Sequence, residues 1–302
     1  MYLTSNFKVL HLLVVATVVV VVLAASGTSY LNDPLLKKFA AESNGALKPV
    51  TNFHGRRNPL TGPQGISLRD FKHAPPRKNG AYLDATLIAM ELSTHNWALG
   101  HILTATGGVD VDKAKVILSS RSYQDETGDH TVAPILVDVQ KQRSGRGNAP
   151  WWIEAYDSAI TSAIQQKYGV LGRWPDDKAF LELFTGSHGI HLGNSTFARR
   201  VWKRRLIEQT AQKVPVVVGT SAPEDYGDGP HPALLKYPHA YAVEGVTRDT
   251  TSDYEWEIAT ITLRDAETAT KGVTYKFADV LYQLHDLWWV VDSGPGQNNP
   301  EK

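Results

Sequence analysis

The order of two hydrophobic periodicities along the chain constrains its fold more than any single motif. Apart from one alternating stretch at 133–140, apolar residues recur at helical spacing before residue 213, whereas apolar runs and alternation follow it. The helical spacing predicts a helix beginning near Asp84 and further helices at 150–169, 176–186 and 196–213. The alternation predicts strands at 133–140, 214–220, 239–249 and 255–265, then a short helix and a last strand within 274–293. Helices followed by antiparallel strands are typical of α+β proteins.

This pattern divides the chain into segments of different character. We expect a helical lobe at 80–213 and a β-rich lobe at 214–302, and the 302 residues suffice for a sizeable core. Residues 27–79 are rich in Pro, Gly, Lys and Arg and predict an irregular N-terminal extension, with a short helix at Leu35–Ala41. A propeptide is the alternative interpretation of this extension.

Residues 1–26 have the pattern of a secretory signal peptide. The apolar run Val9–Ala25 follows Lys8 and ends in small residues. We therefore expect a secreted protein with no membrane association after cleavage. The run is 17 residues long, at the lower edge of a spanning helix, so a single uncleaved N-terminal membrane anchor is the alternative.

Charge and cysteine content exclude several function classes. The 31 basic and 31 acidic residues give a net charge of zero, which argues against a nucleic-acid partner. One predicted helix does carry a basic stripe, which we interpret as a solvated face; it consists of Arg199, Arg200, Lys203, Arg204 and Arg205. The chain has no cysteine, so it has no disulfide, no zinc ribbon and no thiol nucleophile.

Common catalytic and cofactor motifs are absent from the sequence. No glycine-rich phosphate loop follows a predicted strand, and the Gly-x-Ser-x-Gly signature of serine esterases does not occur. His188 and His191 follow a predicted helix without the His-Glu-x-x-His spacing of a metallopeptidase, so we interpret them as loop histidines without metal. We therefore expect no cofactor and no metal.

One pair of residues has the chemistry of a catalytic site. His239 opens one predicted strand and Asp265 ends the next, so a hairpin would bring both to the same end of the sheet. A carboxylate that holds one imidazole nitrogen orients the other toward a reacting group. The alternative is a pair of unrelated polar residues at strand ends.

The order of several short segments resembles the catalytic domain of calpain, a family of papain-like cysteine endopeptidases. The most specific of them are HAYAVEGV at 239–246, similar to the family's His-Ala-Tyr strand, and PWWIEAYDSAI at 150–160, similar to its Glu-x-Ala-Tyr helix. ITLRDAE at 261–267 resembles the Leu-Arg-Asn-Pro-Trp-Gly segment. The resemblance spans roughly Gly80 to Asp292 and implies the two-lobed papain-like fold.

The resemblance assigns roles to individual positions. It places the catalytic base at His239 and the residue that orients it at Asp265, where the family has Asn. It places the oxyanion-hole residue at Asn79 in place of Gln, and the nucleophilic cysteine at Ala85. Alanine has no lone pair, and loss of a nucleophile typically costs ~10⁶ in rate.

The sequence therefore leads to the hypothesis of a secreted pseudopeptidase that binds a peptide or protein ligand in a retained cleft. One alternative is an active hydrolase that uses Thr86, Ser93 or a His239-activated water, and another is an unrelated secreted α+β enzyme. Calcium is left open, because the acidic residues that hold it in calpains are not identified here. Oligomeric state is not assigned.

Overall fold

The computed structural model describes ten segments of the chain. They are residues 30–51, 66–73, 80–108, 113–122, 131–140, 151–168, 177–193, 199–222, 233–252 and 254–291. The expected signal peptide at 1–26 and the oxyanion-hole position Asn79 lie outside them. Within the described segments, none of the helices has the length and apolar character needed to cross a membrane.

The described helices are distributed along the whole chain. They are α2 (Pro34–Glu42), α3 (Gly80–Glu91), α4 (Trp151–Tyr168), α5 (Asp177–Thr185), α6 (Arg199–Ala211) and the short α7 (Phe277–Val280). Short 3-10 helices occur at Tyr30–Asn32, Leu68–His73 and Asn96–Gly100. Helix α2 begins after Asp33, whose carboxylate accepts the backbone N–H of Leu35 at 2.8 Å, so a side-chain cap sets its start.

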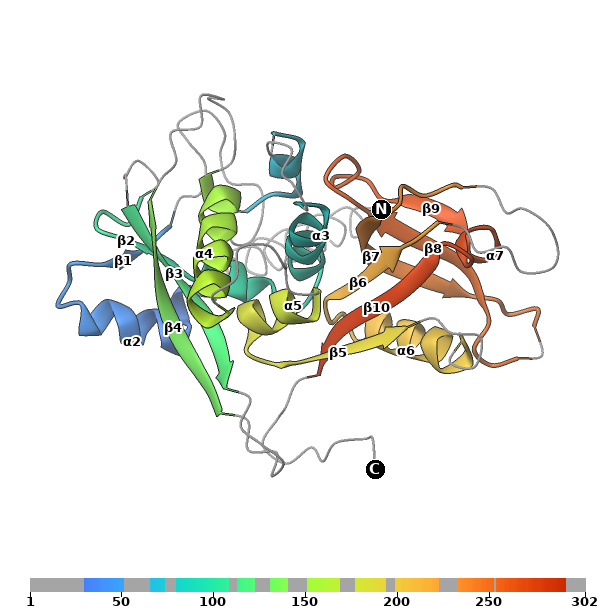
Figure 1. Cartoon of the computed structure of the whole chain (residues 1–302), viewed down its shortest axis with the longest axis horizontal. Helices are drawn as coiled ribbons and strands as arrows, with labels where there is room; N and C mark the ends of the chain where they lie inside the picture. The colour runs from blue at the N-terminus through green and yellow to red at the C-terminus, as the bar shows by residue number, and fades with distance from the viewer. Residues whose placement is uncertain are drawn as a thin grey trace, which may run out of the picture.

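A four-stranded antiparallel sheet forms one end of the molecule (Figure 1). Its strands, in spatial order, are β1 (Lys48–Pro49), β2 (Ile102–Thr104), β3 (Lys113–Ser122) and β4 (Thr131–Gln140). Helices α4 and α5 pack against it. The indole of Trp152 on α4 is fully buried and meets the Phe71 ring edge-on at 5.6 Å, which ties α4 to the 3-10 helix 68–73.

A six-stranded antiparallel sheet forms the other end, in the order β5-β10-β6-β7-β8-β9. Its strands are β5 (His188–Gly193), β6 (Val216–Thr220), β7 (His239–Arg248), β8 (Ile258–Arg264), β9 (Val273–Lys276) and β10 (Leu284–Val291). Side chains alternate between the two faces of a strand. Accordingly, Ala240 and Ala242 of β7 join the hydrophobic core that contains α3, while Tyr241 and Val243 join the core that contains α6.

The α+β class is confirmed, but several expected elements differ. Helix α3 begins at Gly80 and not near Asp84. The segment 80–213 is not simply helical, because it also contains β2 to β5. Strand β3 alternates Lys113 and Lys115 with buried Ala114 and Val116 and continues into buried Ile117 and Leu118, a pattern that the sequence interpretation overlooked.

Strand β5 also corrects an expectation, because His188 and His191 lie on a strand and not in a loop. Its sequence, HGIHLG, contains two glycines and has little β propensity of its own. The segment is a strand because β10 pairs with it over its whole length, from Val291 opposite His188 to Asp286 opposite Gly193. Such long-range pairing leaves no local signal in the sequence.

Gly219 of β6 leaves space for the indole of Trp288, which lies on the neighbouring strand β10 at the sheet face that adjoins α3. A Cβ at this position would lie 2.6 Å from Cη2 and 2.8 Å from Cζ3 of Trp288. That indole is 5% exposed, stacks on His191 and meets the Tyr82 ring of α3 edge-on, so it has no space to retreat. This close contact explains why the position requires glycine.

We therefore expect Gly219→Ala to lower the free energy of unfolding by about 1–3 kcal/mol, as overpacked core positions do. Urea denaturation followed by circular dichroism measures this change. Gly193→Ala is the matched control, because a Cβ at Gly193 meets no atom within 4 Å. Equal stability of the two variants would contradict the packing argument.

Candidate functional site

His239 is fixed at the first position of β7, where its neighbours hold the backbone. It pairs with Thr220 of β6 in the strand register. The hydroxyl of Thr220 is within hydrogen-bond distance of two carbonyl oxygens, that of Lys236 at 2.7 Å and that of His239 at 3.1 Å. The imidazole is 18% exposed and lies edge-on to the Tyr241 ring, at 4.7 Å between ring centres. The ring is therefore positioned at the sheet margin with limited access to solvent.

The residues just before His239 are held by the side chain of Gln283. Its Oε1 accepts the backbone N–H groups of Leu234 at 2.7 Å and Leu235 at 2.9 Å, and its Nε2 donates to the Leu235 carbonyl at 3.0 Å. Gln283 is 1% exposed, so these bonds are shielded from water. This clamp fixes the approach of the chain to β7.

Asp265 follows β8 directly and uses its two carboxylate oxygens differently. Oδ1 accepts the backbone N–H groups of Glu267 at 3.0 Å and Thr268 at 2.9 Å, and the Thr268 hydroxyl at 3.0 Å. Oδ2 lies 3.1 Å from Lys236 Nζ and 3.4 Å from His239 Nε2. One oxygen therefore holds the turn after β8, and the other faces two basic groups.

Burial alone would raise the pKa of the Asp265 carboxyl. The interaction with His239, the Thr268 N–H and the bond and charge of Lys236 outweigh burial and hold this pKa well below its usual range. Burial would lower the pKa of Lys236, but hydrogen bonds to Glu267 and Asp265 raise it above its ordinary value. Burial raises the pKa of Tyr241 to about 12. At neutral pH the cluster therefore holds an ionised carboxylate, a charged ammonium and a neutral phenol.

The His239–Asp265 pair is an electrostatic contact and not a directed hydrogen bond. The 3.4 Å separation lies within ion-pair range, yet Nε2 is buried and makes no hydrogen bond to the described residues. Because Nε2 faces the carboxylate, Nδ1 is the nitrogen that could act on a bound group. Lys236 shares Oδ2, which distinguishes this cluster from a simple imidazole–carboxylate dyad.

Ala85 is the sixth residue of α3 and is completely buried. Helix α3 packs against β6 and β7, and Ala85 lies in the same hydrophobic core as Ala240 and Ala242 of β7. Three small side chains in this core favour a close approach of helix and strand. The expected nucleophile position thus lies on a helix that contacts the His239 strand, but it is inside that helix and not at its start.

The alternative nucleophiles do not have the environment that catalysis requires. Thr86 is completely buried, and its hydroxyl makes no hydrogen bond to the described residues. The Ser93 hydroxyl donates to the Met90 carbonyl at 2.8 Å and accepts the His95 N–H at 3.0 Å, so it caps the end of α3. Neither hydroxyl has a base as its hydrogen-bond partner among the described residues.

The two histidines of β5 contact different carboxylates. His188 Nδ1 lies 3.5 Å from Glu182 Oε1, and His191 Nε2 lies 2.7 Å from Asp286 Oδ1. Within the described segments, no group of three or more His, Asp, Glu or Cys side chains is arranged to hold a metal ion. The sequence stretch 125–129, which contains Asp125, Glu126 and Asp129, lies outside the described segments.

Sequence reasoning missed a pair of acidic side chains at the C-terminal end of α3, partly buried Glu91 and buried Asp70. Burial and the neighbouring Asp70 carboxylate raise the pKa of Glu91 to about 8. Asp70 accepts a hydrogen bond from the Trp152 indole at 2.8 Å. In the sequence Glu91 resembles an ordinary polar residue at a helix end, because Asp70 approaches it only through the fold.

The comparisons with protein families and curated proteins give no match, so the geometry of the site is the main evidence for a function. None of the models of known protein families matches the chain. The search of curated proteins gives no match either. A function must therefore be argued from the His239–Asp265 cluster, the position of Ala85 and the motifs in the sequence.

Proposed function

We propose that this protein is a catalytically inactive relative of calpain-type, papain-like cysteine peptidases that binds an extended peptide or protein segment beside His239. The observation that carries the proposal is the position of three residues. His239 Nε2 lies 3.4 Å from Asp265 Oδ2, and α3, which carries Ala85, packs against the strand that His239 opens. The motif resemblance assigns the base, its orienting partner and the nucleophile to these same three positions.

The chemistry at these positions supports binding without cleavage. Papain-like cleavage needs a thiolate beside an imidazolium, and the chain has no cysteine at any position. A methyl group at Ala85 cannot attack a carbonyl carbon, and its complete burial separates this position from a substrate. The ionised Asp265 also forms an ion pair with Lys236 and accepts a hydrogen bond from the turn after β8.

The same cluster offers polar groups to a ligand. Lys236 is 49% exposed and Glu267 is 76% exposed, and their side chains form an ion pair at 2.8 Å. Together with the imidazole of His239 they provide donors and acceptors at one end of the sheet. An extended peptide carries an unpaired N–H and C=O at each residue, which such groups can bind.

Fluorescein-labelled β-casein, an unstructured chain, is a suitable probe of both binding and cleavage. We expect it to bind the wild-type protein in fluorescence anisotropy and to remain intact on gels. His239→Ala should weaken binding by about tenfold, the typical effect of losing one good polar contact. His285→Ala is the matched control, because His285 is an exposed histidine on β10.

Three outcomes would overturn the proposal. Cleavage of casein that His239→Ala abolishes would show an active hydrolase. No saturable binding by the wild-type protein would remove the peptide-binding function. Equal loss of affinity in the His285 variant would place the binding site elsewhere.

Secretion and calcium belong to the same proposal. Secretion rests on the pattern of residues 1–26, with a single N-terminal membrane anchor as the alternative. Calcium binding is left open without an assigned site, because groups of three or more acidic or histidine side chains that could hold the ion are absent only from the described residues, and the acidic stretch 125–129 lies outside them.

A further inference from the structure

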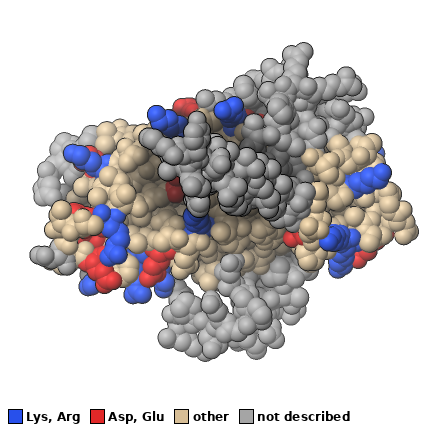
Figure 2. Space-filling model, turned by 180° about the vertical axis from the view of Figure 1, so that it is seen from behind, with Lys and Arg blue, Asp and Glu red and all other residues tan. Residues whose placement is uncertain are grey.

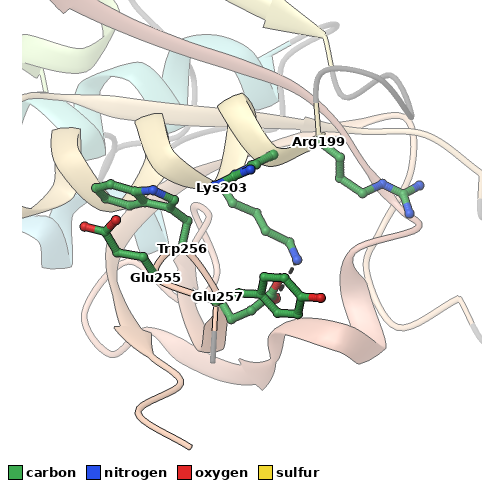
Figure 3. Close-up of a pocket in the computed structure, with 7 residues that line it drawn as sticks. Arg199, Lys203, Glu255, Trp256 and Glu257 are labelled. Atoms are coloured by element: carbon green, nitrogen blue, oxygen red, sulfur yellow. Dashed lines mark hydrogen bonds and ion pairs between the residues drawn. The ribbon is translucent and has the colours of Figure 1, made fainter. Parts of the chain in front are cut away.

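A second site lies at the far end of β7 from His239, between helix α6 and the turn that joins β7 to β8. It is a pocket of about 260 Å³ (Figure 3). One wall consists of Arg199, Arg200 and Lys203 of α6, and the other of residues 254–257. Because β7 spans ten residues, the two sites are separated by roughly 30 Å.

The α6 wall carries three basic side chains, Arg199, Arg200 and Lys203, and the facing wall carries two carboxylates, Glu255 and Glu257. Lys203 Nζ reaches across the pocket to Glu257 Oε2 at 2.6 Å, so this pair is neutral overall (Figure 3). Arg200 is exposed and has no ion-pair or hydrogen-bond partner among the described residues. The first turn of α6 contains no acidic residue, which leaves the positive end of the helix dipole without a carboxylate within the turn.

The opposite wall is aromatic. Tyr254 is 73% exposed, the most exposed large hydrophobic side chain among the described residues. The indole of Trp256 lies beside α6 (Figure 3), with the guanidinium groups of Arg204 and Arg248 at 5.2 and 5.5 Å from its ring. Arg204 and Arg248 do not line the pocket, so it combines the aromatic side chains of Tyr254 and Trp256 with the guanidinium groups of Arg199 and Arg200.

This positive charge is local and does not extend over the protein. On the face turned away from Figure 1, basic and acidic side chains are intermixed at the end formed by the six-stranded sheet (Figure 2). Arg204 and Arg205 both contact the carboxylate of Glu208, which reduces the charge of the basic stripe beyond the pocket. A long polyanion would therefore meet alternating charges, whereas a small anion at the pocket would meet three basic side chains and two carboxylates.

We propose that this pocket binds a small organic anion in which a carboxylate or phosphate is attached to a flat ring. Guanidinium groups bind both anions through paired N–H donors, which favours Arg200 as the main contact. The ring would stack on the phenol of Tyr254 or beside Trp256. An apolar cavity of about 150 Å³ accommodates benzene, so about 260 Å³ accommodates one ring and its charged substituent.

Isothermal titration with phenyl phosphate tests the proposal, with inorganic phosphate and phenol as the two halves of the ligand. We expect saturable binding of one phenyl phosphate per chain, at least about tenfold tighter than either half alone. Arg200→Gln and Tyr254→Ala should each weaken it by about tenfold, and Glu255→Gln should strengthen it by removing a carboxylate from the wall. Arg69→Gln is the matched control, because Arg69 is an exposed arginine outside the pocket lining.

Three results would contradict the proposed anion site. If inorganic phosphate binds as tightly as phenyl phosphate, the aromatic wall has no role and the proposal is wrong. If Arg69→Gln reduces affinity as much as Arg200→Gln, the anion does not occupy this pocket. Absence of saturable binding up to millimolar concentrations, with the protein folded by circular dichroism, overturns the site altogether.

Discussion

Asp265→Ala is expected to lower the free energy of unfolding by about 3 kcal/mol, because one substitution removes the acceptor of three hydrogen bonds and the counterion of Lys236. The carboxylate is 6% exposed and its bonds to Thr268 are partly buried, so water replaces it incompletely as the acceptor. For a chain of 302 residues the loss corresponds to a melting temperature lower by roughly 5 °C. Differential scanning calorimetry at pH 7 measures it.

Asp265→Asn separates the role of the charge from that of the turn. The amide oxygen can still accept from Glu267 and Thr268, but the amide nitrogen would face the donors of Lys236 and His239. We expect an intermediate loss of about 1–2 kcal/mol. The comparison is informative because the proposed resemblance to calpains aligns Asp265 with an Asn of that family.

The low pKa of Asp265 gives this contribution a defined dependence on pH. The folded-state pKa lies below the unfolded-state value, so the carboxylate stabilises the fold fully at pH values above the unfolded-state value, near 3.9. The stabilisation is lost as pH falls through the folded-state pKa. Stability curves of Asp265→Asn should therefore fall less steeply than wild type below about pH 4.

Glu267→Ala is the control for the surface part of the cluster. Glu267 also pairs with Lys236, but it is 76% exposed, and exposed ion pairs contribute only about 0–1 kcal/mol. A loss for Glu267→Ala as large as that for Asp265→Ala would show that the ion pair with Lys236, and not the buried turn, determines the stability of this region.

The fold could be predicted from sequence where periodicity was local. The alternation at 239–249 predicts β7 within one residue, and the amphipathic pattern at 150–169 matches α4. The predictions failed for β5, whose strand conformation depends on pairing with β10. The start of α3 was predicted four residues late, because Asp84 is a favourable N-cap residue by type but is buried within the helix.

The candidate site was predictable to a similar extent. Two strands joined by a short turn place His239 and Asp265 at the same end of the sheet, and this juxtaposition follows from β pairing alone. The participation of Lys236 was not predictable, because its contact with Asp265 depends on the chain segment held by Gln283. The pocket at α6 could not be predicted from the sequence, because the basic stripe does not indicate that residues 254–257 lie opposite it.

Ala85→Cys would give the protein a single thiol, since the natural chain has no cysteine. We expect this thiol to react with iodoacetamide at pH 7.5 at least ~100-fold more slowly than an exposed thiol. Ala85 is completely buried in an apolar core, and such surroundings raise the pKa of a thiol and exclude the reagent. Reaction would then require local opening, and a 100-fold protection corresponds to about 2.8 kcal/mol.

Ala278→Cys supplies the exposed reference, because Ala278 is solvent-exposed on α7. The extra sulfur at position 85 also fills a tight core, so circular dichroism must show that the variant is folded before its alkylation rate is interpreted.

The double variant Ala85→Cys/His239→Ala decides between two geometries. If the single variant reacts rapidly and the double variant slowly, His239 activates the thiol, and the position is an open catalytic cleft that lost only its nucleophile. If both react slowly, burial of α3 against β7 has closed the position, and a ligand must bind outside it, at the surface formed by His239, Lys236 and Glu267.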